Sequence, residues 1–152
     1  MILGVLAMFM TFSTSVLAGD GSLTVNATVL TSASVTQNTA LNFGTFALTD
    51  DSSAGTVDTT GAATSNVDQM SAPTAGVVDI SGTASTVVNI SVTNATLAGP
   101  GADMIATLTV PSATVTTDGS GAATSNVNGT LAVAAGQAPG SYTGTASVIV
   151  AY

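Results

Sequence analysis

Alternation of apolar and polar residues is the dominant pattern along this chain. It is clearest in the stretch LTVNATV at residues 23–29, where apolar side chains occupy every second position. A period of two places alternate side chains on opposite faces of a strand, so a strand with one apolar face is predicted here. The alternation returns at residues 41–48, 104–110 and 141–152, and the last of these segments is predicted to be the longest strand.

Shorter apolar runs and turn-forming residues complete the predicted set of elements. Residues 77–82 and 85–92 are predicted to be two neighbouring strands joined near Gly82, and residues 130–134 a short strand. Clusters of Gly, Pro, Asp and Ser predict loops at residues 50–55, 95–102 and 136–140. Gly44, inside its strand, indicates a bulge or a close backbone approach. No segment after residue 20 has a helical period, so the sequence predicts an all-β sandwich of about eight strands.

The first residues have a different character from the rest of the chain. Residues 1–12 are almost wholly apolar, and Val16 and Ala18 fit the small-residue pattern of a signal-peptidase site. We expect residues 1–18 to be a signal peptide whose basic start is missing, with Met1 an internal methionine of a longer reading frame. The alternative is an apolar helix retained in the mature protein. Residues 19–31 would then form an N-terminal extension, and residues 32–152 the sandwich domain of a secreted protein.

The composition excludes most catalytic chemistry. The chain has no Lys, Arg, His, Cys or Trp, and its net charge is −8. Without imidazole or thiol groups, Ser-His-Asp and Cys-His catalysis and zinc sites cannot be built. A uniformly acidic chain also repels nucleic acid. The sequence therefore predicts a protein that is not an enzyme, has no cofactor and binds neither nucleic acid nor a small-molecule substrate.

The absence of Lys and Arg gives a prediction that needs no assumption about the fold. Trypsin cleaves after these two residues, so the chain should stay intact in trypsin even when it is denatured. A protease that cleaves after aromatic residues or Leu should digest the unfolded form. Gel electrophoresis of both digests checks this, and tryptic fragments of the pure protein would contradict it.

Three segments together resemble a known family. They are LNFGTF at residues 41–46, GTV at 55–57 and PGSYTGTASVIVAY at 139–152. The chain resembles domain-of-unknown-function family 4402 over residues 23–152, and it is similar in style to the spore-coat-protein-U pilins of archaic chaperone–usher systems. The resemblance implies an immunoglobulin-like pilus or surface-filament subunit that lacks one strand. It also implies a periplasmic chaperone and an outer-membrane usher as possible partners.

The N-terminal extension has the form of the missing strand. Its alternate apolar residues would fill a neighbouring subunit's groove by β-augmentation, which propagates head to tail into a filament. The predicted donor-strand residues are Leu23, Val25, Ala27 and Val29. The C-terminal strand is predicted to line the acceptor groove through Tyr142, Val148, Val150 and Tyr152. The alternative is that residues 23–29 pair within their own domain, as the first strand of a self-complete adhesion or binding module.

Three smaller features each have two interpretations, and a fourth, the set of glycosylation sequons, has one. Asp50 and Asp51 could hold Ca²⁺ or form a solvated turn. Tyr142 could form a tyrosine-corner contact or be a core residue with its hydroxyl at the rim. The sequons at Asn26, Asn89, Asn94 and Asn128 are expected by chance in a Ser/Thr-rich chain. The repeated heptapeptide GAATSNV, at residues 61–67 and 121–127, is a duplication remnant or, as we prefer, a coincidence in two exposed loops.

The pattern also predicts the residues of the core. We expect the following side chains to be buried: Val25, Phe43, Phe46, Val78, Ile80, Val88, Ile90, Leu108, Val148 and Val150.

Overall fold

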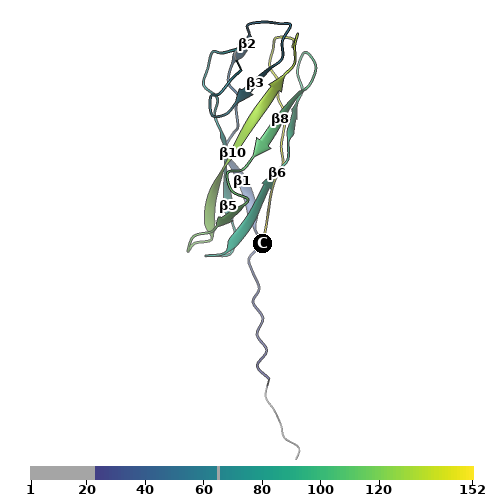
Figure 1. Cartoon of the computed structure of the whole chain (residues 1–152). Coiled ribbons are helices and arrows are strands. Elements are labelled where there is room, and N and C mark those ends of the chain that lie inside the picture. Colours follow the sequence, from purple (N-terminus) through teal and green to yellow (C-terminus); the bar gives the residue numbers. More distant parts are fainter. Residues whose placement is uncertain (1–22, 65) are drawn as a thin grey trace, which may run out of the picture.

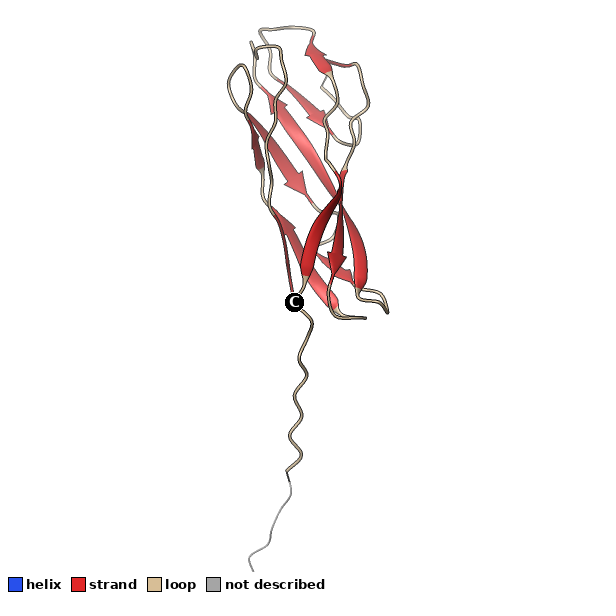
Figure 2. Ribbon diagram, turned by 180° about the vertical axis from the view of Figure 1, so that it is seen from behind, coloured by secondary structure: helices blue, strands red, loops and turns tan. Residues whose placement is uncertain are grey.

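The computed structural model describes residues 23–64 and 66–152, and the predicted signal peptide lies outside them. The described part of the chain is built from antiparallel strands without a helix, so the predicted all-β sandwich is confirmed (Figures 1 and 2). The strands are β1 (Ser34–Thr39), β2 (Phe46–Leu48), β3 (Gly55–Asp58), β4 (Val67–Gln69), β5 (Gly76–Ser81), β6 (Val87–Val92), β7 (Ala95–Leu97), β8 (Met104–Thr109), β9 (Thr114–Thr116), β10 (Ala122–Val133) and β11 (Val148–Ala151).

The sandwich is made of one large sheet and two small ones. The large sheet has the order β1-β5-β10-β8-β7, and β3 also pairs with β10. The opposing sheet has the order β11-β6-β9, while β2 and β4 form a separate ribbon. The molecule is elongated, with β2 and β3 near one end and the C-terminal end of the chain at the other (Figure 1). Strands β1 and β11 are therefore edges of two different sheets.

The core consists of two apolar clusters along the long axis. The first contains Phe43, Val57 and Leu131, and the second contains Ile80 and Val88. Leu41 and Leu108 pack against both clusters and so connect them. The core is continuous from one end of the sandwich to the other, although few aromatic residues contribute to it.

Strand β10 is the longest strand and the centre of the large sheet, which the sequence pattern does not predict. It runs from Ala122 to Val133, where only residues 130–134 were expected to form a strand. Its first half pairs with β5, and its second half pairs with β3 and β8. Pairing on both edges stabilises a segment whose side chains are mostly small, with few large apolar residues, so strand formation here depends on tertiary contacts.

Strands β5 and β6 lie in different sheets, so the prediction that they are neighbours joined near Gly82 is wrong. The connection between them crosses the sandwich instead of forming a hairpin. The Thr117 side chain, 2% exposed, holds this corner, since its hydroxyl donates a 2.5 Å hydrogen bond to the carbonyl of Thr83. The hydroxyl thus gives a hydrogen-bond partner to a backbone carbonyl at the corner that has none in the β-sheets.

The C-terminal strand is much shorter than predicted. Only Val148–Ala151 forms β11, and before it Thr143 makes an isolated bridge to Ala98. Gly144 lies so close to β7 that a Cβ built on it would be 2.2 Å from the Thr96 carbonyl oxygen. The segment thus crosses the end of β7, which itself begins the stretch predicted to be a loop. Gly44 makes the close approach expected of it, with a φ of +79° and its Cβ position 2.4 Å from the Ser71 carbonyl oxygen.

Half of the ten residues predicted to form the core are buried. Phe43, Val78, Ile80, Val88 and Ile90 are buried. The other predicted residues of the sandwich are half-buried, namely Phe46, Leu108, Val148 and Val150. Val25 is 82% exposed, so its assignment to the core of its own domain is wrong. It precedes the first strand and contacts neither cluster in the described structure.

The two copies of GAATSNV begin with the same turn. In each copy an Asp three residues before the Gly, Asp58 or Asp118, accepts a hydrogen bond from the Gly amide, and both glycines have positive φ. The copies then diverge, since the second continues into β10 and is not the exposed loop that we predicted. Shared turn chemistry explains the first residues of the repeat, because this turn needs a Gly at the left-handed position.

Hydrogen bonds to the carboxylates of three turns predict that the stability of the protein depends on pH. The pKa values of Asp50, Asp58 and Asp118 are lowered, because each carboxylate accepts hydrogen bonds from the hydroxyl and the amide of the residue two positions on. The Asp118 carboxylate also accepts one from the Ala122 amide. A lowered pKa in the folded state stabilises the protein above the ordinary carboxyl pKa near 4, and this stabilisation is lost as the pH falls through the folded value. The melting temperature should therefore decrease as the pH is lowered below about 4.

A variant that lacks the three charges tests this explanation. Changing these Asp residues to Asn keeps a side-chain oxygen for each turn but removes the titration. The melting temperature of the triple variant should vary less between pH 6 and pH 2 than that of the wild-type chain. Parallel pH profiles for the two proteins would contradict the assignment.

Candidate docking groove

A long groove opens between the two edge strands of the sandwich. Its volume is about 1190 Å³, above the range of about 300–1,000 Å³ of ordinary ligand pockets. One wall is formed by most of β1, by β2 and by the segment between them, and the other by residues 137–146 with Val148. The groove is therefore the place where the two sheets separate.

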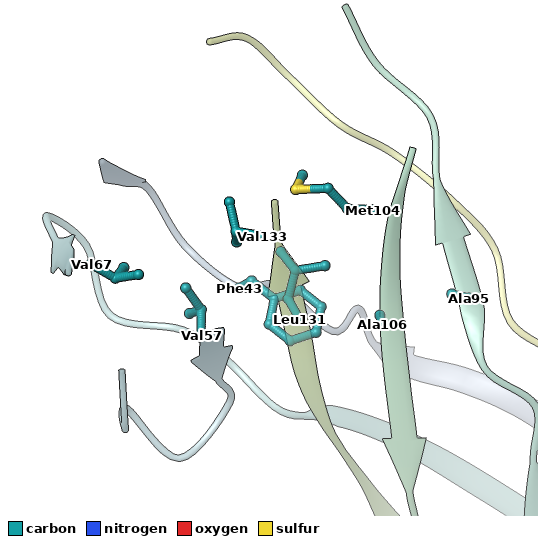
Figure 3. Packing of buried hydrophobic residues seen from close by; sticks show 8 residues of the cluster. All are labelled: Phe43, Val57, Val67, Ala95, Met104, Ala106, Leu131 and Val133. Atoms are coloured by element: carbon teal, nitrogen blue, oxygen red, sulfur yellow. The ribbon is translucent and has the colours of Figure 1, made fainter. Parts of the chain in front are cut away.

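The floor of the groove is the hydrophobic core itself. Phe43, Met104 and Leu131 line it and are each at most 6% exposed. Figure 3 shows their side chains in one cluster with Val133, which also lines the groove. Nothing polar separates the groove from the core at these residues, so apolar side chains entering the groove would pack directly on it.

Each wall of the groove includes residues of a strand with a free edge, β1 in one wall and β11 in the other. Within the described structure, β1 pairs only with β5, and β11 pairs only with β6. The two strands lie close to each other without forming a ladder. Three apolar side chains along this opening are half-buried, namely Val35, Leu41 and Val148. Free backbone groups beside half-buried apolar side chains form a template for another strand.

Tyr142 fixes the C-terminal wall. Its hydroxyl donates a 2.8 Å hydrogen bond to the Ala138 carbonyl and accepts a 2.9 Å hydrogen bond from the Gly101 amide. The ring lies against Gly99, where a Cβ would be 2.4 Å from the ring. A Tyr hydroxyl bonded to a carbonyl four residues upstream is the tyrosine-corner contact, while the ring packs against the first cluster. Both interpretations of Tyr142 therefore apply.

The groove carries little charge and one unsatisfied acceptor. Among the described residues that line it, Asp51 has the only charged side chain. Gln137 donates a 2.6 Å hydrogen bond from Nε2 to the Ala102 carbonyl, but its Oε1 is buried without a partner in the described structure. A buried acceptor without a donor is unfavourable, and an N–H group bound in the groove would satisfy it.

The N-terminal extension lies outside the sheets. Residues 23–33 leave the domain beside the C-terminal end and run away from it as a single extended trace (Figures 1 and 2). Leu23, Val25 and Val29 are each more than 80% exposed, and Ala27 is also exposed. In this structure the extension does not pair with its own domain as a first strand.

The structure divides the predicted C-terminal groove residues into two groups. Tyr142 and Val148 line the groove. Val150 packs against the second core cluster, and the Tyr152 hydroxyl bonds to Thr31 and Thr83 at the base of the domain. The wall that sequence reasoning missed is β1, whose sequence SVTQNT offers one apolar residue and so gives little strand signal.

The other candidate sites have local explanations. Asp50 accepts hydrogen bonds from Ser52 and Ser53, which makes it part of a turn. The described residues contain no group of three or more acidic side chains that could hold a metal ion. No helix among them is long and apolar enough to cross a membrane.

Comparison with known proteins gives one match. The family described as domain of unknown function DUF4402 matches residues 33–152. No curated protein and no solved structure matches the chain. The matched region begins at the root of β1 and includes both walls of the groove, but it leaves out the apolar extension. The chain therefore belongs to the DUF4402 family, and the family region coincides with the sandwich domain.

Proposed function

We propose that this protein is a structural subunit of an extracellular pilus or surface filament, assembled by donor-strand complementation. The observation that carries the proposal is the groove between the free edges of β1 and β11, in a chain that also carries an exposed segment of alternating apolar residues. In the proposed filament, residues 23–29 of one copy fill the groove of the next. The likeness to spore-coat-protein-U and chaperone–usher pilins belongs to this proposal, as do secretion and a chaperone and usher as partners.

The dimensions of donor and acceptor match. Residues 23–29, as a strand, would span about 23 Å at about 3.3 Å per residue. The six residues of β1 present about 20 Å of free edge. Four alternate apolar side chains would face the floor of Phe43, Met104 and Leu131, while backbone groups would pair with a free edge. One strand thus satisfies both needs of the groove.

The distribution of charge favours a second copy of this chain as the occupant. All charged side chains of the protein are acidic, so most surfaces of two copies repel each other. Residues 21–49 and 134–152 contain no Asp, and they include the extension, β1 and the C-terminal wall. Contact between the extension and the groove is therefore free of the repulsion that other orientations would meet.

Electron microscopy of the purified chain tests the proposal. We expect filaments that lengthen with protein concentration, because a head-to-tail contact does not close. An excess of a synthetic peptide covering residues 21–31 should cap the grooves and leave short oligomers or monomers. The same peptide with Val25→Asp should have little effect. A monodisperse monomer that ignores both peptides would contradict the proposal and favour a self-complete binding module.

A further inference from the structure

We infer that Thr31, Thr83 and Tyr152 form a clamp that directs the extension outward and prevents it from filling the groove of its own chain. This inference rests on the proposed function and concerns how the choice between two occupants of the same groove is made. The occupants are the extension of the same chain and the extension of a second copy. Only the second choice builds a filament.

The clamp holds both backbone groups of Thr31. The Thr31 amide donates a 2.7 Å hydrogen bond to Thr83 Oγ1, and the Thr31 carbonyl accepts a 2.6 Å hydrogen bond from the Tyr152 hydroxyl. The Thr83 amide in turn donates a 2.6 Å hydrogen bond to the Tyr152 hydroxyl oxygen. Three residues from distant parts of the sequence thus form a closed set of hydrogen bonds around the root of the extension.

Contacts with the folded domain hold Thr83 and Tyr152 of the clamp in place. The buried hydroxyl of Thr117 holds the Thr83 carbonyl at the corner between β5 and β6. Gly82 leaves the space for the Tyr152 hydroxyl, since a Cβ at Gly82 would lie 2.6 Å from that oxygen. Beyond the clamp, residues 23–29 have no hydrogen bond or packing contact in the described structure. Thr31 is therefore the residue at which the extension is attached to the domain.

The position of this point decides which groove the extension can reach. To fill its own groove, the extension would have to turn at residues 31–33 and return along the free edge of β1 as a hairpin. In such a hairpin Val29 would lie opposite Val35, and Thr28 opposite Thr36. A turn there would redirect the Thr31 amide and carbonyl and so break the hydrogen bonds to Thr83 and Tyr152. The clamp therefore opposes self-filling and leaves the groove open for a second copy.

A disulfide reports the folded-back state directly, because the chain has no cysteine of its own. The test uses the full chain with Thr28→Cys and Thr36→Cys, refolded at low concentration and mildly oxidised. Directly opposite residues of a hairpin have Cβ atoms about 4.5–5.5 Å apart, near disulfide distance. In the outward state the eight residue steps from position 28 to position 36 span about 26 Å. A bond within one chain therefore marks self-filling, and gel mobility separates it from a bond between two chains.

Loss of the clamp should raise the folded-back population. Adding Tyr152→Phe or Thr83→Val to the cysteine background should increase the disulfide within one chain about tenfold. Uptake of a labelled peptide of residues 21–31 should fall accordingly. The control is Thr86→Val, in the same loop, whose hydroxyl donates only to the nearby Ala84 carbonyl. It should behave like the cysteine background alone.

The possible outcomes separate this inference from the proposed function. Equal disulfide fractions in the cysteine background, Tyr152→Phe and Thr86→Val would overturn the clamp, even where Val25→Asp still blocks filaments. Filaments that form despite Val25→Asp would overturn the proposed function and the clamp with it. If Thr83→Val does not fold, Tyr152→Phe decides alone, since it removes one oxygen from a side chain that is 41% exposed.

Discussion

Replacing Val25 by Asp is expected to leave the purified protein as monomers or amorphous aggregates in place of filaments. In the proposed assembly, Val25 enters the groove above the apolar floor that contains Phe43 and Leu131. A carboxylate there loses its water, and the protein offers no Lys, Arg or His to pair with it. The cost is on the order of several kcal/mol at every junction, which lowers the association constant by a factor of about a thousand or more.

The neighbouring residue provides the matched control. Thr24→Asp adds the same charge one position away, but alternate side chains point to opposite faces of a strand. It should therefore reduce assembly far less than Val25→Asp does. Both positions are exposed in the free subunit, so neither change should alter the melting temperature of the monomer. Electron microscopy and size-exclusion chromatography read out assembly, and equal assembly of the two variants would show that residues 23–29 are not a donor strand.

The sequence predicts the strands that carry their own pattern. β8 begins at Met104 and alternates buried with more exposed side chains as expected, and β5 does the same over Gly76–Ser81. β1 is different, because Val35 is the only apolar residue of SVTQNT and the strand is stabilised by pairing with β5. A strand with few apolar residues leaves little periodicity to detect.

The candidate site was predictable from one side only. The alternation of residues 23–29 marks the extension in the sequence. The groove depends on which strands become edges of separate sheets, and β11 and β1 acquire that position only through the crossing of the chain between β5 and β6. The clamp joins Tyr152 to Thr31, 121 residues earlier. Hydroxyl residues are so frequent in this chain that nothing in the sequence distinguishes these two.

The family match also separates the groove from the N-terminal extension. The DUF4402 match begins at residue 33, two residues after the clamped Thr31. The sandwich, its groove and the far half of the clamp, Thr83 and Tyr152, all lie inside the match. Only the extension and the backbone that the clamp holds lie before it. The domain therefore contains the acceptor of the proposed assembly, and the donor is an addition at its N-terminal side.

Replacing Phe43 by Ala is expected to lower the free energy of unfolding by about 3–5 kcal/mol, as for other buried aromatic side chains. Phe43 is 6% exposed, contacts the first core cluster and lines the groove. Its ring lies over β10 at Gly129, where a Cβ would be 3.1 Å from the ring. The chain has no disulfide to limit the unfolded state, so such a loss is a large part of a typical stability of about 5–15 kcal/mol.

Phe46→Ala is the control, because Phe46 is only half-buried and packs at the edge of the same cluster. Urea unfolding of both variants gives the comparison, and the midpoint should fall much further for Phe43→Ala at an unchanged slope. Repeating the titration with saturating peptide of residues 21–31 tests the groove at the same time. The peptide should stabilise the wild-type chain and Phe46→Ala more than Phe43→Ala, whose groove floor has lost its ring. Equal losses for the two Phe variants would mean that Phe43 is not part of the core that forms the groove floor.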